Sequence, residues 1–214
     1  MRTRVKICGI CRTEDAHEAA ALGADAIGLV FYDKSPRVVS LQQAAAISRQ
    51  LPAFVTSVAL FLDPDAELVR QVVAQVPIDL LQFHGSEPAD FCRGFNRPYI
   101  KALCVESIGT VAQIHAGVLA SAADFGDARG VLLDSNAPGA AGGTGEVFDW
   151  TAIPPGLEQP LVLAGGLGVH NVAEAVRKIK PWAVDVSSGV EREKGIKDAA
   201  LMRAFINEVN RCDG

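Results

Sequence analysis

Two chemically reactive side chains stand at the ends of short apolar runs of the sequence. Cys8 follows the run VKI, and Asp134 follows the run VLL. A thiol has a reference pKa of about 8.5, so a modest downward shift would supply a thiolate that can act as a base. A carboxyl group that is partly removed from water has a raised pKa and can act as an acid. Cys8 and Asp134 are therefore a candidate base and acid, although a small hydrophobe and a loop cap are the structural alternatives.

Two further side chains are candidates for binding a substrate. Arg37 lies in SPRVVS, and His84 follows LLQF. A guanidinium at the edge of a site can pair bidentately with a carboxylate, whereas elsewhere it is a solvated surface charge. His84 could hydrogen-bond a substrate or satisfy the end of a strand. Cys8 and Cys11 form a CxxC pair, but no second CxxC or histidine cluster completes a zinc set, so the sequence predicts no metal.

Glycine-rich turns occur in three consecutive segments of the C-terminal half. They contain Gly143 and Gly145, then Gly165 and Gly166, then Ser188 and Gly189. Glycines let backbone N–H groups approach an anion closely, and a following helix N-terminus favours negative charge. One such cluster is commonly an ordinary turn, but three in succession indicate a phosphate site.

Eight apolar runs alternate with amphipathic or alanine-rich segments. The runs predict strands at 5–8, 26–31, 57–61, 80–84, 99–103, 130–134, 161–164 and 183–186. Several are almost continuously apolar, as in parallel strands that are covered on both faces. Helical spacing appears at 68–76, 172–179 and 201–209, and a fifth helix is expected near 105–119. The segment 148–153 is too short for a full helix.

Helix starts are predicted from capping residues. Thr13, Ser86 and Asp63 are the expected N-caps, with Pro64 at the first position of the helix that follows Asp63.

Eight strands that alternate with helices in 214 residues predict an α/β protein with a single (β/α)8 TIM barrel, one domain over 1–214. The open, doubly wound sheet is the alternative, but the first turn, CGICRTED, lacks the GxGxxG pattern of dinucleotide-binding sheets. In a (β/α)8 barrel the active site lies at the carboxyl ends of the strands, where the candidate residues fall.

Composition excludes several classes of function. The net charge is −5, which argues against nucleic-acid binding because that requires a basic face. No apolar run is long enough to span a membrane, and the N-terminus lacks a secretory pattern. Five irregularly spaced cysteines suggest reduced thiols, so we expect a cytoplasmic protein.

The ordered motifs resemble the phosphoribosylanthranilate isomerase family over essentially the whole chain. They are VKICGI at 5–10, GADAIGLVFYDKSPRVVS at 23–40, LLQFHGSE at 80–87, VLLDS at 131–135, GGTGEVFDW at 142–150, LAGGL at 163–167 and VDVSSGVE at 184–191. The resemblance implies an intramolecular oxidoreductase, an aldose-ketose isomerase of tryptophan biosynthesis. Such an enzyme converts N-(5-phosphoribosyl)anthranilate to 1-(2-carboxyphenylamino)-1-deoxyribulose 5-phosphate by an Amadori rearrangement.

The resemblance also implies roles for individual residues. Cys8 would be the general base, Asp134 the general acid and Arg37 the ligand of the anthranilate carboxylate, while Asp185 would position substrate. The turns at Gly143, Gly145, Gly165, Gly166, Ser188 and Gly189 would hold the phosphate. Cys11 departs from the family pattern, which more often has Thr or a basic residue there. No cofactor is expected, and the partner is a phosphorylated small molecule bound by a monomer or homodimer.

Four other functions remain as alternatives. An indole-glycerol-phosphate synthase would require a Lys/Glu set and an extra N-terminal helix, for which strand one begins too early. A triosephosphate-isomerase-like enzyme would require a strand-end glutamate base, which we do not find. A phosphate-ligand sensor or a thiol module at Cys8 and Cys11 would bind without turnover of phosphoribosylanthranilate.

Overall fold

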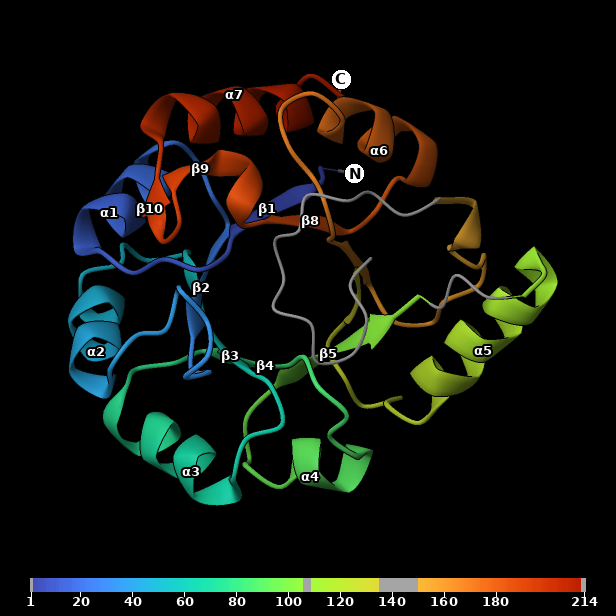
Figure 1. The fold of residues 1–214 in the computed structure, drawn as a ribbon, viewed down its shortest axis with the longest axis horizontal. Coiled ribbons are helices and arrows are strands. Elements are labelled where there is room, and N and C mark those ends of the chain that lie inside the picture. Colours follow the sequence, from blue (N-terminus) through green and yellow to red (C-terminus); the bar gives the residue numbers. More distant parts are fainter. Residues whose placement is uncertain (1, 106–108, 135–149, 213–214) are drawn as a thin grey trace.

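The strands form a closed parallel barrel (Figure 1). The computed structural model describes residues 2–105, 109–134 and 150–212. Neighbours along the barrel follow the chain from β1 to β8, and β8 closes onto β1. The strands are β1 (Arg4–Ile7), β2 (Ala26–Val30), β3 (Thr56–Phe61), β4 (Leu80–Phe83), β5 (Tyr99–Cys104), β6 (Val131–Asp134), β7 (Leu161–Leu163) and β8 (Ala183–Val186). The predicted (β/α)8 barrel is confirmed.

Helices surround this barrel as an outer ring (Figure 1). They are α1 (Thr13–Ala21), α2 (Leu41–Arg49), α3 (Ala66–Gln75), α4 (Ala89–Arg93), α5 (Val111–Ala123), α6 (Val172–Ile179) and α7 (Ala199–Asn210). Short 3₁₀ turns, η1 (Trp150–Ala152) and η2 (Ser188–Val190), and a hairpin of β9 (Glu191–Glu193) and β10 (Ile196–Lys197) complete the described elements. In the described ranges no helix has the length and apolar character needed to cross a bilayer.

The three predicted helix starts are wrong. Helix α1 begins at Thr13 itself, and α4 begins at Ala89, three residues after Ser86. Helix α3 begins at Ala66, so Pro64 lies outside it. Asp63 has a left-handed backbone (φ 46°), and its Oδ1 accepts a hydrogen bond from the backbone N–H of Ser86 at 2.7 Å. The carboxylate of Asp63 therefore joins two loops instead of capping a helix.

The fifth helix also begins later than predicted. Thr110 and Gln113 form a reciprocal capping box, and α5 starts at Val111. A Thr followed three residues later by Gln is a sequence signature of a helix N-terminus. The hydrophobic pattern alone placed the start too early, because the buried apolar run continues one residue beyond strand β5, to Val105.

Side chains on the outer surface of the barrel form the main hydrophobic core. Buried residues such as Ile27, Phe61, Leu81 and Leu133 belong to one cluster that includes helix residues such as Val69. The barrel interior has a smaller apolar cluster, Ala102, Leu132, Val162, Ala164 and Ala183. Burial on both faces explains why the strands appear in the sequence as almost continuous apolar runs.

A buried ion pair ties together the loops that follow β3 and β4. Lys101 Nζ lies 3.0 Å from Glu87 Oε2, and both side chains are buried. Glu87 also accepts hydrogen bonds from the backbone N–H groups of Asp63 at 2.8 Å and Gly85 at 3.0 Å. The carboxylate therefore fixes two loops at the carboxyl end of the barrel, one of which carries His84.

We predict that Glu87→Gln destabilises the protein by about 3–5 kcal/mol, because it leaves the Lys101 charge buried without its counter-ion. The matched control is Glu67→Gln, which breaks the exposed Glu67–Arg70 pair. That change should cost less than about 1 kcal/mol. Urea unfolding of both variants measures the difference; equal midpoints would contradict a stabilising role for the Glu87 contacts.

Candidate active site

A cavity opens at the carboxyl ends of the strands and brings together most of the predicted site residues. About 780 Å³ of empty space, which includes open solvent at its mouth, lies among its lining residues. Small-molecule sites are concave pockets of this kind. Its lining includes Cys8, Arg37, His84, Asp134, Gly165, Gly166, Asp185 and Ser188. Gly189 does not line it, and Gly143 and Gly145 lie outside the described residues.

Cys8 follows β1 directly and is buried at the base of this cavity. Its backbone N–H donates to Val186 O on β8 at 2.8 Å, so the barrel closure fixes its position. Burial raises the pKa of the Cys8 thiol, while attraction to Lys6 lowers it and repulsion from Asp185 raises it further. In the ligand-free protein the loss of hydration therefore outweighs the nearby positive charge, and the pKa of Cys8 lies above its ordinary value.

Lys6 and Asp185 form an ion pair inside the barrel. They are register partners on β1 and β8, and Lys6 Nζ lies 2.8 Å from Asp185 Oδ1. Burial opposes the charged lysine, but attraction to Asp185 and Cys8 outweighs burial and raises the pKa of Lys6 to about 12. The sequence interpretation missed Lys6. The alternation of side chains along a strand could have indicated it, since Lys6 and Cys8 are two residues apart and so point to the same face.

Asp134 ends β6 and faces His84, which follows β4. His84 Nε2 lies 3.5 Å from Asp134 Oδ2, and both side chains are largely buried. On the other side of the ring, His84 Nδ1 lies 3.1 Å from Nε2 of the fully buried Gln82. The histidine ring is held between the barrel interior and the candidate acid, so both predicted residues reach the same cavity.

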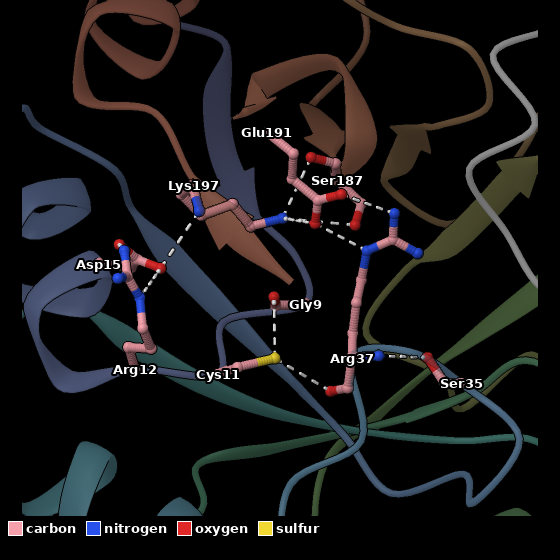
Figure 2. A network of polar contacts seen from close by, with 9 residues as sticks. All are labelled: Gly9, Cys11, Arg12, Asp15, Ser35, Arg37, Ser187, Glu191 and Lys197. Carbon is pink, nitrogen blue, oxygen red and sulfur yellow. Dashed lines mark hydrogen bonds and ion pairs between the residues drawn. The ribbon is translucent and has the colours of Figure 1, made fainter. Parts of the chain in front are cut away.

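Arg37 is buried and held by an ion pair, in contrast to a solvated surface arginine. Its Nε and Nη2 donate to the two carboxylate oxygens of Glu191 at 2.7 and 2.8 Å (Figure 2). Lys197 Nζ lies 2.8 Å from the same carboxylate and donates to Ser187 O at 3.1 Å. A bidentate ion pair fixes the plane of a guanidinium. Glu191 and Lys197 were missed in the sequence, where Glu191 is far from Arg37.

The charges of this network shift one another. Burial raises the pKa of Glu191, but hydrogen bonds from Arg37 and attraction to Lys197 outweigh burial and lower it below its ordinary value. Burial lowers the pKa of Lys197 more than attraction to Glu191 raises it. The carboxylate of Glu191 is therefore stabilised in its charged form by two cations.

Cys11 supports the backbone around Arg37. Its Sγ lies 3.4 Å from Arg37 O and 3.7 Å from Gly9 O, within the distance of weak S–H hydrogen bonds (Figure 2). Cys8 and Cys11 are both free thiols. Among the described residues, no three His, Cys, Asp or Glu side chains are grouped as metal ligands.

The turns after β7 and β8 depend on glycine. Gly165 and Gly166 have positive φ values of 82° and 61°, which other residues rarely adopt. The side chain of Asn171 accepts from the Gly168 N–H at 2.8 Å and donates to Gly166 O at 3.0 Å, and this closes the turn before α6. A Cβ at Gly189 would lie 2.1 Å from a backbone oxygen of the β7 turn, so Gly189 allows the two turns to touch.

The chain matches known proteins over almost its full length. Residues 5–208 match the family model described as N-(5'phosphoribosyl)anthranilate (PRA) isomerase. An N-(5'-phosphoribosyl)anthranilate isomerase from Pseudomonas paraeruginosa is 54% identical over 206 residues, 96% of this chain and 94% of that protein.

Solved structures agree with this match. The phosphoribosyl anthranilate isomerase from Thermotoga maritima has a TM-score of 0.85 and 38% identity, with 97% of this chain and 98% of that one covered. Another phosphoribosyl anthranilate isomerase, solved in complex with reduced 1-(o-carboxyphenylamino)-1-deoxyribulose 5-phosphate, has a TM-score of 0.79, 35% identity and the same coverage. The resemblance seen in the sequence is confirmed, together with the isomerase function expected from it: the chain belongs to the N-(5'-phosphoribosyl)anthranilate isomerase family.

Proposed function

We propose that Cys8 and Asp134 are the base and acid with which this chain isomerises N-(5'-phosphoribosyl)anthranilate in tryptophan biosynthesis. The observation that carries the proposal is that both side chains, from β1 and β6, line one cavity at the carboxyl end of the barrel. The cavity also contains a guanidinium and glycine turns, the groups that an aromatic carboxylate and a phosphate would require.

The rearrangement proceeds by two proton transfers. Asp134 donates a proton to the furanose ring oxygen, and the C–O bond breaks to give an open-chain protonated Schiff base. The Cys8 thiolate then removes the proton from the second sugar carbon, and the C–H electron pair moves toward the iminium nitrogen. The resulting enolamine tautomerises to the aminoketose, 1-(2-carboxyphenylamino)-1-deoxyribulose 5-phosphate. The substrate's own nitrogen accepts the electrons.

The two anionic ends of the substrate are assigned to different parts of the cavity. Arg37 binds the anthranilate carboxylate, while the turns at Gly165–Gly166 and Ser188 bind the phosphate through backbone N–H groups. His84 and Asp185 line the space between and position the sugar. Gly143 and Gly145 are assigned to the phosphate site from the sequence alone.

The proposal also covers the ligand, the oligomeric state and the cellular location of the enzyme. A phosphorylated small molecule is the partner, and the protein acts as a monomer or homodimer in the cytoplasm. The five irregularly spaced cysteines favour a reducing compartment.

We expect Cys8→Ala to lower kcat by about 10²–10⁴-fold, because the base at the second sugar carbon is lost. Affinity for a reduced product analogue should change little. Turnover is followed by the loss of substrate fluorescence. Cys11→Thr is the control and should remain near normal, since a hydroxyl can replace the thiol contact to the Arg37 backbone. Near-normal turnover by Cys8→Ala would remove Cys8 from the mechanism.

Asp134→Asn should stop ring opening, because an amide keeps the shape of the carboxyl group but cannot donate its proton. Turnover and urea unfolding are measured on one preparation. If Asp134 only stabilises its loop, unfolding should change by about 1 kcal/mol while the rate stays normal. A lost rate with unchanged stability supports the role as acid.

Arg37→Met should weaken binding of the full product analogue by about 10–100-fold, the equivalent of a charged hydrogen bond. An analogue that lacks the carboxylate should bind almost as to the unmodified protein. Gly166→Ala, at a left-handed turn on the phosphate side, should weaken both ligands alike. Isothermal titration compares them. Equal losses of both ligands with Arg37→Met would show that the assigned orientation is reversed or wrong.

A further inference from the structure

A lysine inside the barrel interior is an unusual feature that the proton transfers described above do not use. Interiors of (β/α)8 barrels are filled mainly by branched apolar side chains. Lys6 instead turns inward from β1, and only 6% of its side chain is exposed. Burying an ion pair seldom stabilises a protein more than apolar residues of the same size would. The Lys6–Asp185 pair therefore has no adequate explanation in stability alone.

The position of Lys6 relates it to Cys8. Cys8 directly follows β1, two positions after Lys6, so the two side chains share the inner face of the barrel. An added Cβ on Gly28, the neighbouring position on β2, would lie 2.7 Å from Cys8 Sγ and 3.2 Å from Lys6 Nζ. The Lys6 ammonium and the Cys8 sulfur therefore both lie beside the backbone of Gly28. Gly28 provides the room for both groups.

We infer that Lys6 is a positioning residue for the isomerase reaction: its ammonium, held by Asp185 under Cys8, stabilises the thiolate that accepts the proton from the sugar. The inference deepens the proposed function, because it concerns the residue assigned as base. Lys6 acts through Cys8 and needs no contact with substrate.

Other charged groups around Cys8 do not replace this effect. Asp185 on β8 opposes the thiolate, and Lys197 on β10 favours it. Arg37 is engaged by Glu191, and Asp134 and His84 line the same cavity from β6 and β4. Attraction to Lys6 is the largest of the effects that lower the pKa of Cys8. Lys6 itself keeps its proton across neutral pH, since its pKa is raised to about 12.

The experiment measures ionisation of Cys8 without substrate. Full-length, ligand-free enzyme is alkylated with iodoacetamide from about pH 7 to about pH 11, because only the thiolate reacts. The peptide that contains Cys8 is quantified by mass spectrometry, so the other cysteines do not contribute. Lys6→Met should move the midpoint of the profile upward by about one pH unit or more. Lys6→Arg, which keeps the charge, should leave the midpoint closer to that of the unmodified enzyme.

Lys101→Met is the matched control. Lys101 is also a buried, ion-paired lysine on a barrel strand, but it contacts Glu87 and the Phe125 ring outside the barrel. Its loss should destabilise the fold without moving the Cys8 midpoint. An unchanged midpoint in folded Lys6→Met, or an equal shift in Lys101→Met, would overturn the inference.

Two further measurements keep the test decisive. In turnover, Lys6→Met should lower kcat at neutral pH by roughly tenfold with KM little changed, and the acid limb of the pH profile of kcat should move to higher pH.

If Lys6→Met does not fold, Gly28→Ala is the second variant. Its added methyl group separates the Cys8 sulfur from the Lys6 ammonium while both charges are kept, and it should also raise the midpoint of the Cys8 alkylation profile. An unchanged midpoint there would count against the inference. Alkylation measures the ionisation of Cys8 without catalysis. The effect of Lys6 on Cys8 can therefore be tested even if Cys8→Ala retains turnover and Cys8 is not the base.

Discussion

The closure of β1 against β8 is the constraint on which the active site depends. In this register Lys6 pairs with Asp185, and the Cys8 N–H donates to Val186 O at the next step. Residues from the two ends of the chain thereby meet at one edge of the cavity. A slip of one residue in β1 would turn Cys8 toward the helices, and a slip in β8 would do the same to Asp185, since successive side chains of a strand point to opposite faces. The closing register therefore fixes both the barrel and the candidate base.

Charge balance in the cavity follows from that geometry. Within the pair Lys6–Asp185 and the group Arg37–Glu191–Lys197, each buried charge lies within hydrogen-bond distance of an opposite charge. The Lys6–Asp185 and Arg37–Glu191 pairs join segments from opposite ends of the sequence, so the cost of burying these charges is met only in the complete fold. Local rules of core composition are broken at functional sites in just this way. The exposed ion pairs on the outer helices, such as Glu174–Lys178, carry no such constraint.

The sequence predicted the strands and the residues at their ends because both depend on local patterns. Apolar runs marked where strands finish, which placed Cys8, His84 and Asp134 at the correct edge of the barrel. The helix starts predicted at Asp63 and Ser86 were missed because a tertiary contact uses both residues: the Asp63 carboxylate accepts from the Ser86 N–H. The Arg37–Glu191 pair joins residues 154 positions apart, and no local pattern indicates it. The pKa of Cys8 could not be predicted from the sequence, because burial of the thiol depends on the completed cavity.

A buried thiol with a raised pKa is compatible with the role of base in the proposed reaction. A thiol of higher pKa gives a thiolate that is a stronger proton acceptor, although a smaller fraction is ionised. In the role inferred for Lys6, its ammonium offsets part of the effect of burial on the Cys8 thiol. The iminium of the open-chain intermediate adds a second positive charge, but only after Asp134 has given up its proton. The thiolate is then favoured at the stage when a base is needed, and the order of the two proton transfers follows from electrostatics in a cavity of low polarity.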